Sequence, residues 1–151
     1  MSAHLSFLFV PDAKRLEWLI NMSVAVRYFS KLGNTKQIAE AIAEGAQTTA
    51  VSIVDEPALA EYVDVLFLGG APYANIMDPQ LKSYGDSLKP EMVGKVVLFT
   101  TSNWSHRTVH ALRKTLRENG IDVEEEHFFA HMLNIKGRKE AAKEFGKKYS
   151  A

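Results

Sequence analysis

From Ser23 onward the chain alternates short β-rich runs with amphipathic helical segments, and this alternation limits its fold more than any other feature. The expected strands are 24–29, 49–54, 63–68, 95–101 and 121–129, and the expected helices are 34–46, 58–62, 79–88, 108–119 and 138–149. Strands that alternate with helices lie parallel and are joined by right-handed crossovers. The sequence therefore predicts an α/β fold, a three-layer α/β/α sandwich around a five-stranded parallel sheet.

Three local signals set helix boundaries. Asn34 with Gln37 three residues later is typical of a capping box in its asparagine form. Asp78 directly precedes Pro79, which suits the first position of a helix. Gly120 follows the fourth helical segment and is expected to end it.

Residues 1–21 differ in pattern from the rest of the chain, and we expect an N-terminal extension followed by a single domain over residues 22–151. The apolar run 5–10 has no basic residue before it and no small-residue cleavage site after it, which argues against a signal peptide. Residues 13–20 are compatible with a short helix. The longest apolar stretches fall short of the roughly 20 residues of a membrane span, so a soluble, cytoplasmic protein is expected.

The amino-acid composition excludes several kinds of redox and metal chemistry. The chain has no cysteine, which excludes disulfides, thiolate nucleophiles and cysteine-ligated metal clusters. Any redox chemistry must come from a bound organic cofactor or from a metal with other ligands. Lysine plus arginine count 18, as do aspartate plus glutamate, so no global field would attract nucleic acid or an anionic membrane.

In an open parallel sheet, ligands bind at the carboxyl ends of the strands. The loops expected there are 30–35, 69–77 and 101–108. The first contains two hydroxyl residues, an asparagine and a glycine before a helix N-terminus, which favours an anion. It contains neither GxxxxGK[ST] nor GxGxxG, so it matches neither a Walker loop nor a dinucleotide fingerprint. Taken alone, it is equally compatible with an ordinary capped loop.

The loops together resemble those of the flavodoxins. The stretch YFSKLGNTKQIA (28–39) is similar to their phosphate loop, LGGAPYA (68–74) to the stretch after their third strand, and VLFTTSNW (97–104) to their second flavin-flanking loop. The resemblance covers roughly residues 23–150. It implies the strand order 2-1-3-4-5 with FMN at the switch point between strands 1 and 3.

The resemblance also implies an FMN electron carrier and assigns cofactor-binding residues. Ser30, Asn34 and Thr35 with nearby backbone amides would hold the phosphate, and Tyr73 and Trp104 would cover the two faces of the flavin ring. The complete set is Ser30, Lys31, Leu32, Gly33, Asn34, Thr35, Pro72, Tyr73, Ala74, Asn75, Thr101, Ser102, Asn103 and Trp104. No catalytic or metal-binding residue is assigned, and a redox partner protein of unknown identity is expected.

Two departures from the family pattern stand out. Leu32 occupies a position where flavodoxins usually have another hydroxyl residue, which removes a phosphate donor. Flavodoxins that serve large partners are also strongly acidic, whereas this chain is neutral and offers Asp78 near the loops against Arg107, His106 and His110. The basic segment 136–148 is favoured as a solvated face, and if it is a docking surface, it is the better candidate for an acidic partner.

Other functions remain as alternatives. One is an FMN-dependent NAD(P)H:quinone-type reductase, and another is a flavodoxin-fold module that no longer binds FMN. The histidine pairs 106/110 and 127/131 lack a third ligand at motif spacing for a metal. A serine hydrolase is disfavoured because no GxSxG motif follows a strand, and a phospho-receiver domain because Ser30 and Gly69-Gly70 stand where its acids would be.

Overall fold

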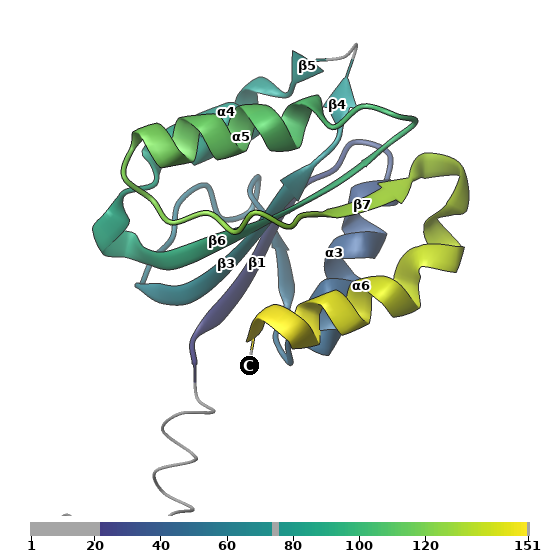
Figure 1. Ribbon diagram of the computed structural model, residues 1–151, viewed down its shortest axis with the longest axis horizontal. Helices are drawn as coiled ribbons and strands as arrows, with labels where there is room; N and C mark the ends of the chain where they lie inside the picture. The colour runs from purple at the N-terminus through teal and green to yellow at the C-terminus, as the bar shows by residue number, and fades with distance from the viewer. Residues whose placement is uncertain (1–21, 74–75, 151) are drawn as a thin grey trace, which may run out of the picture.

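The computed structural model describes residues 22–73 and 76–150, and its elements carry the labels of Figure 1. The extension expected over 1–21, with its short helix, lies outside the described residues. The strands are β1 (Val24–Phe29), β2 (Ala50–Ser52), β3 (Val63–Gly70), β6 (Val93–Ser102) and β7 (Phe128–His131), with a small hairpin of β4 (Pro72–Tyr73) and β5 (Ile76–Met77). The helices are α3 (Asn34–Gly45), α4 (Pro79–Ser87), α5 (Arg107–Glu118) and α6 (Ile135–Ser150), with 3-10 turns η1 (Pro90–Met92) and η2 (Met132–Asn134).

The main strands form one parallel sheet in the order β2-β1-β3-β6-β7. This is the 2-1-3-4-5 order implied by the sequence resemblance, so the predicted fold class is confirmed. Helices α4 and α5 cover one face of the sheet, and α3 and α6 cover the other (Figure 1). Within the described residues, no helix is both long and apolar enough to span a membrane.

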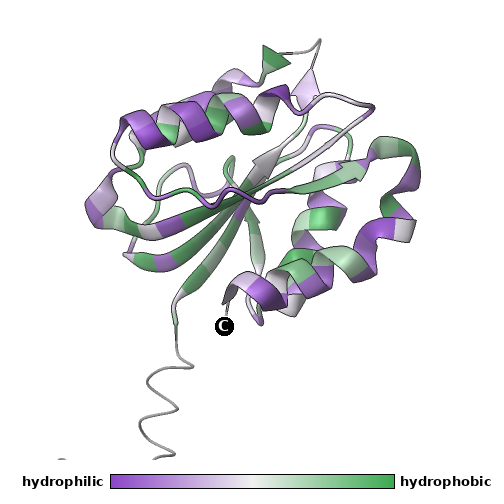
Figure 2. Ribbon diagram, in the orientation of Figure 1, coloured by the Kyte–Doolittle hydropathy of each residue, from purple (hydrophilic) through white to green (hydrophobic). Residues whose placement is uncertain are grey.

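The strands supply two hydrophobic cores because successive side chains point to opposite faces. Leu66 and Leu68 of β3 pack in the core beneath α4 and α5, whereas Val65 and Phe67 pack in the core beneath α3 and α6. The central strands are accordingly hydrophobic along most of their length (Figure 2). This double burial explains why their sequences are continuous apolar runs rather than alternating ones.

The last strand differs from its prediction over 121–129. After Gly120, whose φ of 80° ends α5, the chain touches the sheet through one bridge between Val96 and Val123. Glu124 still donates its backbone N–H to the Val96 carbonyl, but the exposed Glu125 and Glu126 cannot be buried against β6 cheaply, since carboxylates lose hydration there. Regular pairing therefore starts only at Phe128 and continues to His131.

Three other local predictions need correction. Residues 58–62 form bends instead of a helix, because five residues are too few to nucleate one without strong packing. Helix α6 begins at Ile135 rather than at Arg138. The expected capping box is not made: Gly33 is the N-cap residue, no side chain caps α3, and Asn34 is already its first helical residue.

Candidate functional site

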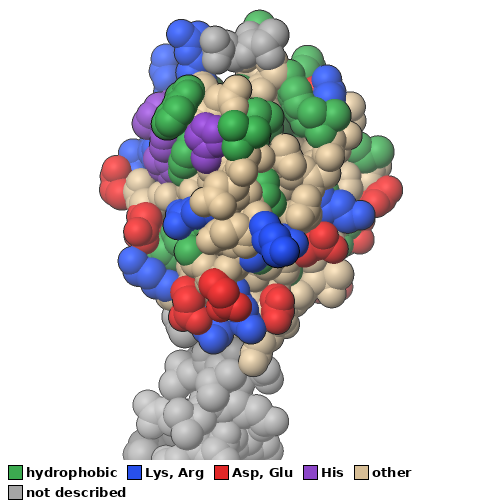
Figure 3. Space-filling model, turned by 90° about the vertical axis from the view of Figure 1, so that its right-hand side faces the viewer, with side chains coloured by type: hydrophobic (Ala, Val, Ile, Leu, Met, Phe, Trp, Pro, Cys, Tyr) green, Lys and Arg blue, Asp and Glu red, His purple; other side chains and the backbone are tan. Residues whose placement is uncertain are grey.

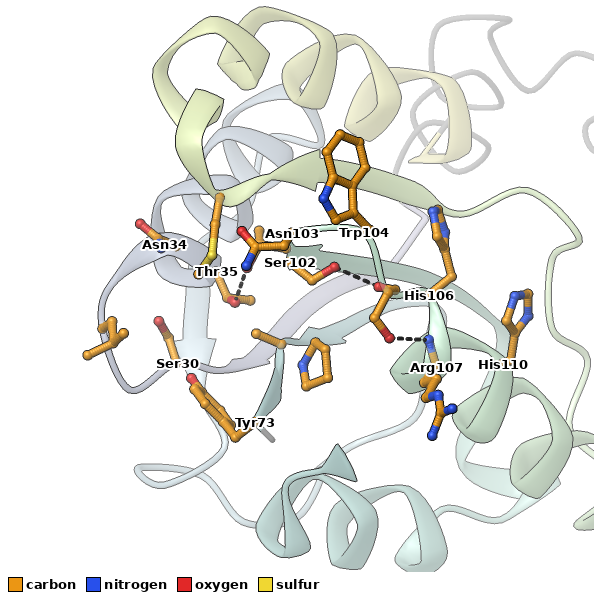
Figure 4. A pocket seen from close by; sticks show the side chains of 16 residues that line it. Ser30, Asn34, Thr35, Tyr73, Ser102, Asn103, Trp104, His106, Arg107 and His110 are labelled. Carbon is orange, nitrogen blue, oxygen red and sulfur yellow. Dashed lines mark hydrogen bonds between the residues drawn. The ribbon is translucent and has the colours of Figure 1, made fainter. Parts of the chain in front are cut away.

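Three loops converge on one cavity of about 750 Å³ at the carboxyl edge of the sheet. This volume falls within the range of pockets that bind small molecules and cofactors. Figure 4 shows side chains from the β1–α3, β3–α4 and β6–α5 connections surrounding it. The lining residues are Ser30, Leu32, Asn34, Thr35, Ala71, Pro72, Tyr73, Thr101, Ser102, Asn103, Trp104, Ser105, His106, Arg107, His110 and Met132.

Most of the residues assigned from the sequence lie together here. Lys31 and Gly33 do not line the cavity, and Ala74 and Asn75 lie outside the described residues. The assignment omitted Ala71, Ser105, His106, Arg107 and His110, although these lie in or beside the predicted loops. It also omitted Met132, whose only sequence signal would have been its position after the last strand.

One end of the cavity is the N-terminus of α3. The first helical hydrogen bond runs from the Gln37 N–H to the Gly33 carbonyl at 3.1 Å, so the N–H groups of residues 34–36 precede the helical ladder. Gly33 has a φ of 94°, which favours glycine, and its own N–H donates to Ser30 Oγ at 3.0 Å. The Ser30 hydroxyl accepts there and keeps its proton for another partner. These groups are suited to an anion.

Thr35 closes the floor of this end. Its hydroxyl lies 2.7 Å from the hydroxyl of Thr101, and the two residues are each 1% exposed. One hydroxyl donates to the other, which leaves a single proton in the pair for a third acceptor. The pair therefore links α3 to β6 and also retains one donor for a ligand.

Tyr73 forms one side of the open middle of the cavity. Its hydroxyl accepts from the Lys31 backbone N–H at 2.9 Å, and its ring packs edge-to-face on Phe29 at 6.4 Å between centroids. The Lys31 ammonium lies 4.4 Å from the Tyr73 centroid and 3.5 Å from a carboxylate oxygen of Asp78. Lys31 thus ties two loops together outside the cavity, in contrast to its predicted place in the site.

Trp104 forms the opposite side (Figure 4). It is 82% exposed and packs edge-to-face on His131, with centroids 4.8 Å apart. The loop behind it is shaped by Ser102 Oγ donating to the Ser105 carbonyl at 2.6 Å and by Ser105 Oγ accepting from the Arg107 N–H at 3.2 Å. An aromatic surface is therefore held open to solvent by an ordered loop.

Beyond Trp104, the cavity ends at a group of histidines on the α5 side. His106 Nδ1 lies 2.8 Å from His127 Nε2, and Arg113 donates to His127 Nδ1 at 3.2 Å. Burial, together with the Arg113 charge, lowers the pKa of His127 to about 4. Neutral His127 accepts from Arg113, so it carries its proton on Nε2 and donates to His106. Among the described residues, no three potential ligands are arranged to hold a metal ion.

The fold matches known structures. A WrbA-like flavodoxin of Agrobacterium tumefaciens is similar with a TM-score of 0.71 and 22% identity, over 86% of this chain and 96% of that one. Flavodoxin 2 of Bacillus cereus is similar with a TM-score of 0.65 and 18% identity, over 84% of this chain and 99% of that one. An archaeal flavodoxin is similar with a TM-score of 0.63 and 19% identity, over 85% of this chain and 96% of that one. No family model and no curated protein matches the sequence. The protein has the flavodoxin-like fold.

Proposed function

We propose that this protein binds FMN in the cavity and acts as a flavodoxin-type electron-transfer protein. The observation that supports it best is the arrangement of the cavity: an anion-compatible helix N-terminus lies at one end, and aromatic rings from two loops lie on opposite sides of its middle. The similar flavodoxins make the same cofactor class the natural candidate. Bound FMN would supply one- and two-electron redox chemistry.

The phosphate would be held at the α3 end by the Ser30 hydroxyl, the Asn34 side chain and the free proton of the Thr35–Thr101 pair. The Leu32 side chain does not displace any of these donors, because it is 79% exposed at the mouth of the cavity. The backbone N–H groups of residues 34–36 add donors that no side-chain substitution removes. The residues present therefore fit a phosphate despite the departure at Leu32.

The isoalloxazine ring would lie between Tyr73 and Trp104. The Tyr73 ring is fixed by its hydrogen bond from Lys31, and the Trp104 ring by His131, so little conformational freedom is lost on binding. Stacking of this kind contributes about 1–3 kcal/mol per ring, by analogy with nucleobases.

The test is the visible absorption of protein purified without added flavin, followed by titration of the flavin-free protein with FMN and riboflavin. Trp104→Ala should lower the affinity for both ligands about tenfold. Asn34→Ala should lower the affinity for FMN about tenfold and leave the affinity for riboflavin unchanged. Gln37→Ala, on the exposed face of the same helix, is the matched control. A colourless protein that does not quench FMN fluorescence would refute the proposal and favour a module that has lost FMN.

The same protein preparation distinguishes an electron carrier from the alternative, a reductase. An electron carrier loaded with FMN should oxidise NADPH only slowly in the presence of menadione unless a reductase is added. Rapid turnover by the purified protein alone would instead establish an NAD(P)H:quinone-type reductase.

A further inference from the structure

The mouth of the cavity is surrounded by exposed apolar side chains. Among the large hydrophobic residues that the structure describes, the four most exposed are Leu133 (85%), Trp104 (82%), Leu32 (79%) and Ile76 (68%). They come from four different connections, after β7, β6, β1 and β3, which all end at the carboxyl edge of the sheet. Exposed apolar side chains gathered at one edge are typical of an interaction surface.

The charges of this rim have one sign. The rim comprises residues 30–36, 71–73, 76–77, 102–110 and 131–137, and their sequences contain no aspartate or glutamate. They contain Lys36, Arg107 and Lys136, and also Lys31, whose charge is paired with Asp78 just outside the rim. In Figure 3 hydrophobic and histidine side chains occupy the upper part of the face with Lys and Arg at its margins, and the acidic side chains lie mostly lower.

These cations differ from those at the far end of α6. Lys143, Lys147 and Lys148 pair with Glu44, Glu144 and Glu126 at 3.2, 3.2 and 2.8 Å. In the described part of the chain, no ion pair involves Lys36, Arg107 or Lys136. These cations of the rim are therefore not neutralised by ion pairs, whereas those of the C-terminal half of α6 are.

We propose that the rim docks a protein partner that presents apolar side chains surrounded by aspartate and glutamate. This inference rests on the proposed function, because docking here would bring the partner to the open middle of the cavity. A second copy of the chain suits the rim poorly, since its cations would face the same cations of the first. An acidic partner supplies carboxylates that pair with the rim cations, and its apolar side chains cover Leu133 and Trp104.

The experiment is a chemical-shift titration of the ¹⁵N-labelled protein at low ionic strength. The probes are an acidic rubredoxin and, with opposite charge, basic cytochrome c. The acidic probe should shift amides of the rim, and added salt should weaken its binding. This readout requires no flavin, so a protein that fails to bind FMN still gives an answer about docking.

Two variants outside the cavity lining test the surface. Leu133→Ser should weaken binding of the acidic probe about tenfold, and Lys136→Glu about fivefold. Lys89→Glu is the matched control, because it changes the net charge equally at the opposite edge of the sheet, beside η1. It should alter binding less than twofold, and none of the three should change FMN affinity.

Other outcomes would overturn the proposal. These are equal effects of the two lysine variants, shifts confined to residues 139–148, a preference of the rim for cytochrome c, or no shift with either probe. Sedimentation of the protein with phosphatidylserine-containing vesicles, without rubredoxin binding, would assign the rim to a membrane surface instead.

Discussion

The buried hydroxyl pair of Thr35 and Thr101 gives the sharpest test of how the site is built. Thr35→Val keeps the shape of the side chain and removes its hydroxyl. Since both residues are 1% exposed at the floor of the cavity, water replaces the lost partner poorly, and the Thr101 hydroxyl is left without its side-chain partner. Such a group costs about 1–3 kcal/mol of folding free energy. Thr101→Val should cost a similar amount for the reciprocal reason.

The double variant separates this pairing from general packing. Replacing both hydroxyls leaves no unsatisfied group, so its free energy of unfolding should be close to that of the wild type. The coupling energy between the two positions is then about 1–3 kcal/mol, well above what independent sites show. Urea unfolding of the flavin-free protein, followed by far-UV circular dichroism, measures all four corners of the cycle.

Ligand binding gives the second half of the same prediction. Thr35→Val removes the hydroxyl that lies on α3 beside the proposed phosphate position, so FMN affinity should fall roughly tenfold. Riboflavin, which lacks the phosphate, should bind as before. Additive destabilisation in the cycle would refute the hydroxyl pairing, and equal losses of FMN and riboflavin would refute the phosphate assignment.

Contacts elsewhere in the fold give three more predictions. Gly69→Ala should destabilise the protein by about 3 kcal/mol or more in urea unfolding, because the new Cβ would overlap the Phe99 ring and carbonyl; a cost below 1 kcal/mol would contradict this packing. Asp78 Oδ1 accepts from the Gln80 N–H at 2.8 Å, so Asp78→Ala should lower stability by about 1 kcal/mol while Asp78→Asn preserves the cap. Folded His127 has a pKa of about 4 against 6.5 for the unfolded residue, so the unfolded state binds more protons as pH falls below 6.5. Stability should therefore drop by about 1–2 kcal/mol from pH 7 to pH 5, allowing for partial exposure, and a profile unchanged in His127→Gln would show that another group is responsible.

The sheet was predictable because its signals are local. The apolar runs of β1 and β3 and the cap at Asp78-Pro79 depend on residues that are neighbours in sequence. The cap of α3 was not predicted, because Asn34 and Gly33 are both acceptable N-cap residues. The left-handed conformation of Gly33, with a φ of 94°, decides between them, because glycine adopts it at little cost.

One part of the site that was missed, around His127 and Met132, depends on one shifted strand. An alternating pattern indicates a strand but not where it joins its neighbour, so the end of β7 was placed at Phe129 instead of His131. This hid the approach of His127 to His106 and the position of Met132 beside the cavity. Both depend on the chain leaving the sheet after Glu124, because the exposed carboxylates of Glu125 and Glu126 stay hydrated there.

The neutral total charge similarly conceals how charge is distributed. Lys143 pairs with Glu44 and Lys148 with Glu126, and these partners are distant in sequence and brought together only by the packing of α6. Charges matched in this way have little left to attract a partner, whereas Lys36, Arg107 and Lys136 remain available at the cavity mouth. A chain with no net charge can thus present a cationic face at its proposed site of electron exchange. The sign of its partner should therefore be inferred from that face, not from the sum over the sequence.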